Sequence, residues 1–374
     1  MKKSLFVLIA MPIIGLIGLA GFNYYVDPFM AFHKSYLEPT VYFHDERTSR
    51  PGLVRKTQTH NVVLGPSSMG FFLANYLENY YGSKSTQLTM GGSTLFEQRL
   101  ILESALETNP VKNVLWGIEL QSVSRGKTEN EYADFPYYLY GNRKGLITKY
   151  LFNYKILHVG LKAMEARQLN QDTSLFVFDL DKRLDRVTIS ERYSFNNFYK
   201  NIKNYFSKEI ENDHKANYSK KNIKENIFHN IEKTVRIHKN IQFDIITPPH
   251  SYLEILYIYL FNKDIYEAFS YLLNEIQKLS QYDNVNVYYF HEKSDFIFEV
   301  NEFSDLRHFS HNLSKEVFKK LKKNKNQYRE YRKIKELSQE ILKKCYNDEI
   351  INVPVDLVQE PESILKCVNL MVGS

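Results

Sequence analysis

The sequence is poor in several kinds of residue, and each shortage excludes a class of protein. Only two of its 374 residues are cysteine, Cys345 and Cys367, which excludes a disulfide-stapled scaffold and a multi-cysteine zinc or iron–sulfur site. Fifteen glycines and eleven prolines exclude collagen-like and low-complexity chains, and no repeat of fixed period is present. The chain is 43% hydrophobic, enough for the core of one large domain or two modest ones. Whether the two cysteines pair is left open.

The sequence has only one long uncharged run. Residues 4–26 carry no charge and follow Lys2 and Lys3. As a helix they would span about 34 Å, more than the roughly 30 Å hydrocarbon core of a membrane. We predict an uncleaved anchor over residues 1–26, with the lysines inside and the body outside the cytoplasm. A signal peptide cleaved near Ala20 is the alternative. A multi-span transporter or channel is excluded.

The charge of the chain is uneven. The net charge is +6, but residues 301–345 hold 13 Lys and Arg against 6 Asp and Glu, so the rest of the chain is close to neutral. This basic segment either binds anionic lipid or an acidic glycan, or is the solvated face of a helix. No nucleic-acid partner is expected, because the anchor directs the body away from the cytoplasm.

Short apolar runs alternate with helical patterns along much of the chain. Strands are predicted at residues 61–64, 87–90, 113–120, 241–246 and 284–290, and helices at 71–81, 94–107, 253–280 and 313–323. This alternation predicts an α/β fold, with helices on both faces of a central parallel sheet. Residues 121–238 interrupt it as an aromatic, mostly helical insertion. We therefore divide the chain into an anchor (1–26), an α/β domain (27–327) and a basic helix with an apolar tail (328–374).

The first strand runs into Gly65-Pro66-Ser67-Ser68-Met69-Gly70. Ligands of such sheets lie at the carboxyl ends of the strands, and a serine at this turn is exposed beside helix-start amides that stabilise an oxyanion. A phosphate-binding loop is excluded because Phe71 follows where lysine is required. The nucleophile elbow of α/β-hydrolases is excluded because Met69 replaces its second glycine. The alternative is an ordinary serine-rich turn that caps a helix.

Two further segments carry chemistry. Gly91-Gly92-Ser93 follows the second strand, where a glycine amide can point at an oxyanion, although a simple tight turn has the same composition. Asp305-Leu306-Arg307-His308 precedes the last helix of the predicted domain. A nucleophilic serine needs a base, and the base needs an orienting carboxylate. Three residues of separation allow Asp305 to reach His308, although such pairs also arise by chance.

Together these pieces, in this order, resemble the SGNH/GDSL hydrolase superfamily over roughly residues 20–325. The likeness is to its membrane-anchored bacterial envelope branch, which includes alginate acetyltransferase-like and D-alanyl-transfer-like proteins. The segments Phe22–Phe29 and Thr247–His250 look like uncharacterised members of that branch. The resemblance implies a three-layer flavodoxin-like sandwich that uses no metal or cofactor. It also implies roles for individual residues: Ser67 as nucleophile, His308 as general base, Asp305 as its orienter, and the Ser67 and Gly92 amides as oxyanion donors.

The chain departs from this pattern after the third strand. The family usually has an oxyanion-binding asparagine there, and this chain has Glu119 and Gln121. An ionised Glu119 cannot donate a hydrogen bond, whereas the Gln121 carboxamide can. Losing one oxyanion donor typically costs roughly 100- to 1000-fold in rate. Glu119, Gln121 and His250 are candidate substrate-binding residues. Glu119 can equally be a buried, hydrogen-bonded carboxylate, and His250 an ordinary loop histidine.

Two functional hypotheses follow from the resemblance. The first is a serine esterase or O-acyltransferase, tethered to the bacterial inner membrane by one span and acting in the periplasm on an envelope glycan. Its partners would be the membrane, the glycan and an acyl donor. The second is a catalytically inactive scaffold of the same fold that binds glycan during envelope polysaccharide assembly. The order Ser67, Asp305, His308 favours the first hypothesis, and the absent asparagine favours the second.

Overall fold

The computed structural model describes residues 2–34, 46–141, 143–168, 216–255, 263–291, 294–323 and 336. The chain forms two compact units. One comprises Met1–Thr59, Leu100–Pro110 and Tyr132–Arg186, and the other His60–Arg99, Val111–Glu131 and Val187–Ser374. The predicted C-terminal helix and tail lie, apart from residue 336, outside the described residues, as do Cys345 and Cys367.

The second unit contains a five-stranded sheet in which every pair of neighbours is parallel, as the alternation of strands and helices predicts. The strands lie in the order β2-β1-β3-β4-β5, the flavodoxin-like order. Their bounds are β1 Asn61–Leu64, β2 Ser85–Gln87, β3 Asn113–Gly117, β4 Gln242–Thr247 and β5 Val285–Tyr289.

The central strands are buried on both faces, as the strands of parallel sheets usually are. All four residues of β1 are buried, and Val63 pairs with Leu115 of β3 on one side and Gln87 of β2 on the other. One acidic residue, Asp244, interrupts the apolar pattern of β4. It is satisfied because its carboxylate accepts hydrogen bonds from the Tyr81 hydroxyl at 2.6 Å and the Asn286 amide at 2.7 Å.

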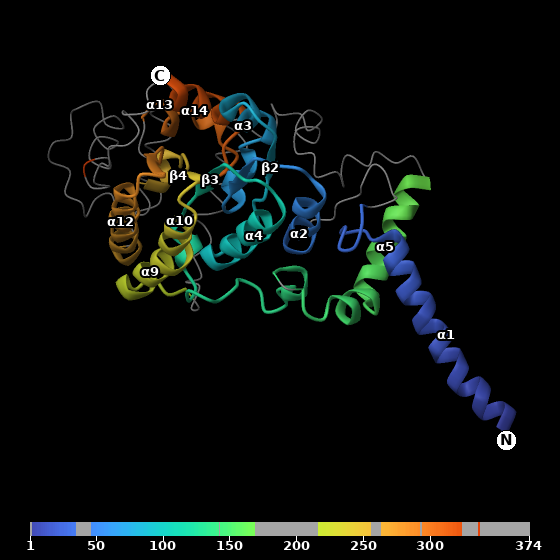
Figure 1. Ribbon diagram of the computed structural model, residues 1–374. Helices are drawn as coiled ribbons and strands as arrows, with labels where there is room; N and C mark the ends of the chain where they lie inside the picture. The colour runs from blue at the N-terminus through green and yellow to red at the C-terminus, as the bar shows by residue number, and fades with distance from the viewer. Residues whose placement is uncertain are drawn as a thin grey trace. The chain divides into compact units, whose positions relative to one another are not determined.

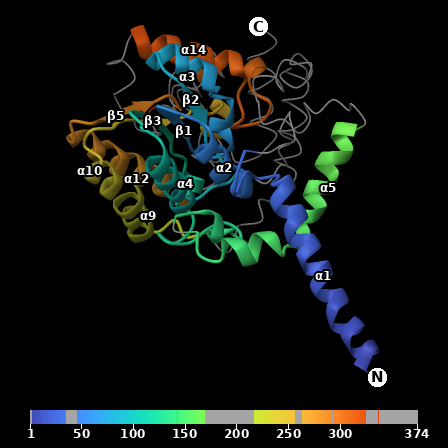
Figure 2. The same ribbon diagram turned by 45° about the vertical axis from the view of Figure 1, so that its right-hand side comes forward.

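Helices cover both faces of this sheet (Figures 1 and 2). On one face lie α3 (Ala74–Tyr81) and α14 (His311–Lys323). On the other face lie α9 (Lys220–Asn226), α10 (Lys233–Ile237) and α12 (Lys263–Lys278). The segment between α9 and α10, Ile227–Glu232, is the π-helix. The unit therefore has three layers.

The second strand lies earlier than its apolar residues suggest. The prediction at 87–90 was wrong in its bounds, because β2 comprises the polar residues Ser85–Gln87 at the edge of the sheet. Edge strands tolerate polar residues, so composition conceals them. The following residues stay beside β1, since the amides of Leu88 and Met90 donate to the carbonyls of Val63 and Gly65 at 2.9 and 3.1 Å.

Several helices also differ from their predicted bounds. The helix expected at 71–81 begins at Ala74, because a 3-10 helix over Ser67–Phe71 precedes it. The helix expected at 94–107 is α4 (Leu95–Thr108), and that expected at 313–323 begins at His311 in α14. Of the helix expected at 253–280, α12 and residues 252–255 are helical, and the segment between them lies outside the described residues.

The first unit contains α1 (Lys2–Val26), α2 (Glu46–Lys56), a π-helix over Ile147–Leu151 and α5 (Tyr154–Gln168). Residues Leu8–Val26 of α1 are long and apolar enough to cross a membrane, as an anchor or as a signal sequence. The helix ends at Val26, and the next residue, Asp27, has a backbone φ of +38°. The Asp27 carboxylate accepts hydrogen bonds from three backbone amides, of Ala31, Phe32 and His33, and from the Tyr150 hydroxyl, each at 2.8 Å.

Candidate active site

The turn after β1 presents Ser67. Gly65 has a φ of +141°, and a Cβ there would lie 2.4 Å from the Met69 side chain and 3.0 Å from the Gly117 carbonyl, so only glycine fits. Pro66 then leads into the 3-10 helix that begins at Ser67. Ser67 is exposed, whereas Ser68 is buried. The sharp turn therefore places one serine hydroxyl above the carboxyl edge of the sheet.

His308, 241 residues further along the chain, reaches this serine, and Asp305 contacts His308. The Ser67 Oγ lies 2.8 Å from His308 Nε2, and His308 Nδ1 lies 2.7 Å from Asp305 Oδ2. The other oxygen of Asp305 accepts the backbone amides of Arg307 and His308, both at 2.9 Å. The structure thus brings Ser67, His308 and Asp305 into one hydrogen-bonded series. The carboxylate fixes the loop with one oxygen and the imidazole with the other.

The electrostatics of this pair suit a general base. Burial alone would lower the pKa of His308 and raise that of Asp305. Their hydrogen bond and opposite charges outweigh burial, so the pKa of His308 is raised and that of Asp305 is lowered. An ionised Asp305 accepts the Nδ1 proton of His308, which leaves Nε2 free to accept a proton from Ser67.

The turn after β2 lies against the Ser67 turn. The turn is closed by a hydrogen bond from the Ser93 amide to the Met90 carbonyl at 3.1 Å. The Ser93 hydroxyl donates to the Gly65 carbonyl at 3.3 Å and so joins the two turns. Gly92 has a φ of +60°, and a Cβ there would lie 3.8 Å from Gln121 Nε2. The structure therefore brings the Gln121 carboxamide beside Gly92, although Gln121 and Gly92 follow different strands.

Glu119 and His250 are both buried, with 4% and 5% of their surface exposed. The Ser68 hydroxyl donates to Glu119 Oε1, and His250 Nε2 lies 3.7 Å from the same oxygen. Burial would raise the pKa of Glu119, but His250, Arg307 and the Ser68 hydrogen bond together hold it at about 2. Both residues, with Gln121, also line a cavity of about 200 Å³. Glu119 is thus a buried, hydrogen-bonded carboxylate at the wall of a cavity.

Sequence reasoning missed three residues of this site: Ser68, Glu254 and Arg307. Glu254 is 2% exposed, with its Oε2 3.1 Å from His250 Nδ1, and its other oxygen accepts the Arg307 Nε–H. The sequence carried a signal for two of them, Glu254 and Arg307. Glu254 follows His250 by four residues, the spacing of neighbours on a helix, and Arg307 lies between Asp305 and His308.

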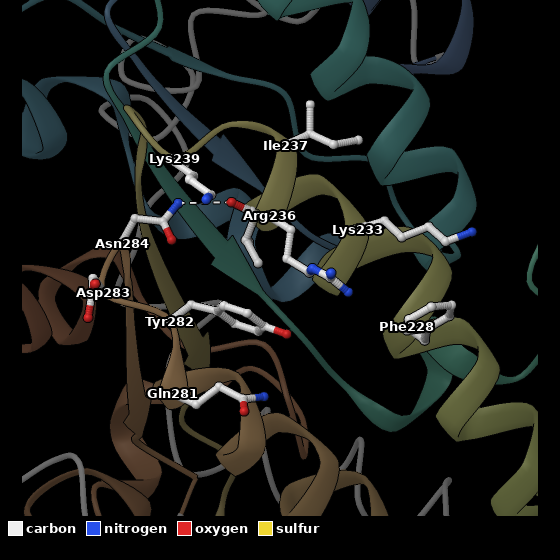
Figure 3. Close-up of a pocket in the computed structure, with 10 residues that line it drawn as sticks. Phe228, Lys233, Arg236, Ile237, Lys239, Gln281, Tyr282, Asp283 and Asn284 are labelled. Atoms are coloured by element: carbon white, nitrogen blue, oxygen red, sulfur yellow. Dashed lines mark hydrogen bonds between the residues drawn. The ribbon is translucent and has the colours of Figure 1, made fainter.

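Another cavity, of about 670 Å³, lies at the opposite edge of the sheet, where β4 and β5 begin (Figure 3). Lys233, Arg236, Lys239 and Asn284 are among its lining residues, and the Asn284 side chain donates to the Val235 carbonyl at 3.1 Å. None of the predicted site residues lines it. Within the part of the chain that the structure describes, no group of acidic, histidine or cysteine side chains is arranged to hold a metal ion.

Comparisons with known proteins give one distant likeness. No protein-family model matches the chain, and no curated protein matches it. A solved structure described as "a putative platelet activating factor from Streptococcus pneumonia" is similar over 74% of this chain and 89% of its own, with 11% sequence identity and a TM-score of 0.36. A likeness at this score carries no argument about activity.

Proposed function

We propose that this protein is a membrane-tethered, SGNH-type serine esterase or O-acyltransferase that acts on a glycan or polymer outside the cytoplasm. The observation that carries the proposal is the hydrogen-bonded series Ser67–His308–Asp305 at the carboxyl edge of the parallel sheet. A serine hydroxyl that meets a carboxylate-oriented imidazole is the arrangement that activates serine in acyl transfer. The experiment that tests it is labelling of Ser67 by a serine-directed fluorophosphonate.

The chemistry runs in two steps. His308 Nε2 takes the Ser67 proton while Oγ attacks the carbonyl carbon of an ester, and the imidazolium then protonates the departing alcohol. This leaves an acyl group on Ser67. In the second step His308 deprotonates water or a sugar hydroxyl, which attacks the acyl carbonyl and releases Ser67 with its proton restored. Hydrolase and transferase differ only in this acceptor.

Three donors serve the oxyanion in this proposal: the amides of Ser67 and Gly92 and the side chain of Gln121. The place of Gln121 beside Gly92 supports its inclusion. Its extra methylene, compared with asparagine, lets a residue further from the strand end reach the same space. Gln121 thus compensates for the absence of the asparagine that the resemblance implies, which Glu119 cannot do as a carboxylate.

The alternative is an inactive scaffold of the same fold that binds glycan. The observation that favours it is the departure from the asparagine pattern at Glu119 and Gln121. The two proposals differ in one measurable property, which is covalent reaction at Ser67. A scaffold keeps the geometry of the site without forming an acyl-enzyme.

We expect the chain to stay in the membrane through α1, with its body outside the cytoplasm. The reasons are the length and apolar character of Leu8–Val26 and the two preceding lysines. A carboxyl-terminal tag should appear in the membrane fraction, resist extraction by alkaline carbonate, and be removed by protease added to intact spheroplasts. A soluble mature protein that begins just after Ala20 would contradict the anchor, and a tag protected in spheroplasts would contradict the orientation.

A further inference from the structure

A chain of buried polar contacts runs behind the site and joins the two segments that carry Ser67 and His308. It begins at Ser68, next to Ser67, whose hydroxyl donates to Glu119. From Glu119 it passes to His250 at 3.7 Å, then to Glu254 at 3.1 Å, and ends where Arg307, next to His308, donates to Glu254. Each end of the chain is thus the immediate neighbour of a residue in the proposed catalytic series.

The charges along this chain balance when His250 is protonated. Glu119 and Glu254 supply two negative charges in a buried place, and Arg307 supplies one positive charge. His250 lies between the two carboxylates with one ring nitrogen toward each, so its protonated form supplies the second positive charge. Buried charges are tolerated when they are paired, and removing one partner leaves the other uncompensated.

Among the described residues, the charged groups that act on His250 are Glu119, Glu254 and Arg307. From α12 the Phe269 ring stacks on the imidazole at a centroid distance of 6.3 Å. Burial lowers the pKa of His250, but the two carboxylates outweigh it, so this pKa is raised. The protonated form is therefore the one that this environment favours.

We infer that the chain Ser68–Glu119–His250–Glu254–Arg307 sets the spacing between Ser67 and His308, with His250 as a positioning residue that acts as a cation. This inference rests on the proposed function and adds to it a residue that touches none of the reacting atoms. The physical reason is that the Ser67–His308 hydrogen bond must break and re-form during each cycle. The buried chain, together with the hydrogen bond from the Ser314 hydroxyl to the Phe71 carbonyl at 2.6 Å, keeps the two segments in place meanwhile.

The test compares rates of fluorophosphonate labelling at Ser67 in three variants of the full chain. His250→Gln leaves one buried carboxylate uncompensated and should slow labelling by about 10- to 100-fold, the effect of a misplacement of roughly 1 Å. His250→Gln combined with Glu119→Gln removes one charge of each sign and should recover most of the rate. His291→Gln is the matched control, because His291 is equally buried and contacts Phe269, yet lies outside the chain.

Two results would overturn the inference: a His250→Gln variant that labels at the wild-type rate per folded molecule, or a double variant no faster than the single one. A wild-type protein that does not label contradicts the proposed function instead.

In that case, thermal unfolding measured from about pH 5 to about pH 9 still tests the charge of His250. Because its folded pKa is raised, the stability advantage of wild type over His250→Gln should be full below about pH 6.5 and shrink as pH rises through the folded pKa. An advantage that does not vary with pH would overturn the cationic role.

A second feature, in the first unit, is a set of exposed apolar side chains on the π-helix and α5. In both ribbon views α5 lies beside the end of α1 (Figures 1 and 2). The π-helix and α5 place Ile147, Phe152, Tyr154 and Leu161 on the surface, with 62%, 45%, 72% and 49% of their areas exposed. Lys149 and Lys162 are exposed on the same segment. We call this set of six residues the 147–162 face.

Direct contacts hold the 147–162 face beside the carboxyl-terminal end of α1, at Phe22 and Asn23. The Asn23 side chain donates to the carbonyls of Leu151 and Asn153 at 2.8 and 3.1 Å. A Cβ at Gly160 would lie 2.9 Å from the Phe22 ring, so the two helices approach closely there. At this same level α1 exposes Tyr24 and Tyr25, by 51% and 65%, and aromatic side chains of this kind are enriched where a helix leaves a membrane.

We propose that the 147–162 face lies in the headgroup region of an anionic membrane, on the side where α1 emerges. Continuity with the exposed tyrosines of α1 supports a lipid surface as the occupant, and the two lysines complement anionic headgroups. This proposal rests on the anchoring of α1 and is independent of any activity at Ser67.

Tyr154→Trp tests this proposal in nanodiscs of anionic lipid. Trp116, the sole tryptophan of the native chain, is fully buried and provides the internal control. Lipids brominated along their acyl chains should quench the new tryptophan and leave the emission of the unsubstituted protein unchanged, and Lys149→Gln with Lys162→Gln should reduce that quenching. A protein that stays in the nanodisc while Trp at 154 is unquenched would overturn the proposal, whereas loss of the protein from the disc would contradict the anchor as well.

Discussion

Replacing Ser67 by alanine is expected to abolish fluorophosphonate labelling and to lower ester turnover by up to about a million-fold, the effect of removing the nucleophile of a serine triad. No other hydroxyl is hydrogen-bonded to the His308 ring in the described residues. Ser68, one residue further, is buried and bonded to Glu119, so it cannot substitute. Intact-protein mass spectrometry would show one adduct on the wild-type chain and none on the variant.

Ser280→Ala is a suitable control, because Ser280 is exposed and bonds only within its own turn. It should label as the wild type does. Persistent labelling of the Ser67→Ala protein would mean that another residue is the nucleophile. A wild-type chain that resists the probe in its folded form would favour the scaffold. Either result would contradict the activity proposed for Ser67.

The second large effect is expected from Asp305→Asn, which should reduce the labelling rate by about 1000- to 10,000-fold. An asparagine oxygen can still accept the backbone amides of Arg307 and His308, so the loop should keep its shape. Its amide nitrogen, however, would face His308 Nδ1 as a donor. The His308 proton would then reside on Nε2, which could no longer accept the Ser67 proton.

The pH dependence distinguishes this effect from simple damage to the loop. In the wild type the rate should rise with pH through the raised pKa of His308, because only the neutral imidazole is a base. Without the negative charge of Asp305 that midpoint should move to lower pH. A variant that keeps the wild-type rate and midpoint would show that Asp305 does not orient His308.

Local patterns accounted for the architecture because strands of parallel sheets are recognisable by themselves. The buried run Asn61–Leu64 and the pattern of β4 required no knowledge of their partners. The edge strand β2 was placed two residues late, because its residues Ser85–Gln87 have no apolar signature and only their pairing with β1 defines them. Burial makes a strand visible in sequence, and an edge position hides it.

The candidate site divides in the same way. The sequence by itself determined that a serine follows the first strand and that Asp305 and His308 are close enough along the chain to pair, since both depend on spacing within a few residues. Only the tertiary structure decided that Gln121 lies beside Gly92, and that Glu254 and Arg307 complete a buried chain through His250. The Gly92–Gln121 and Glu254–Arg307 contacts join residues 29 and 53 positions apart. Their cause is the shared edge at which parallel strands end, which no local periodicity records.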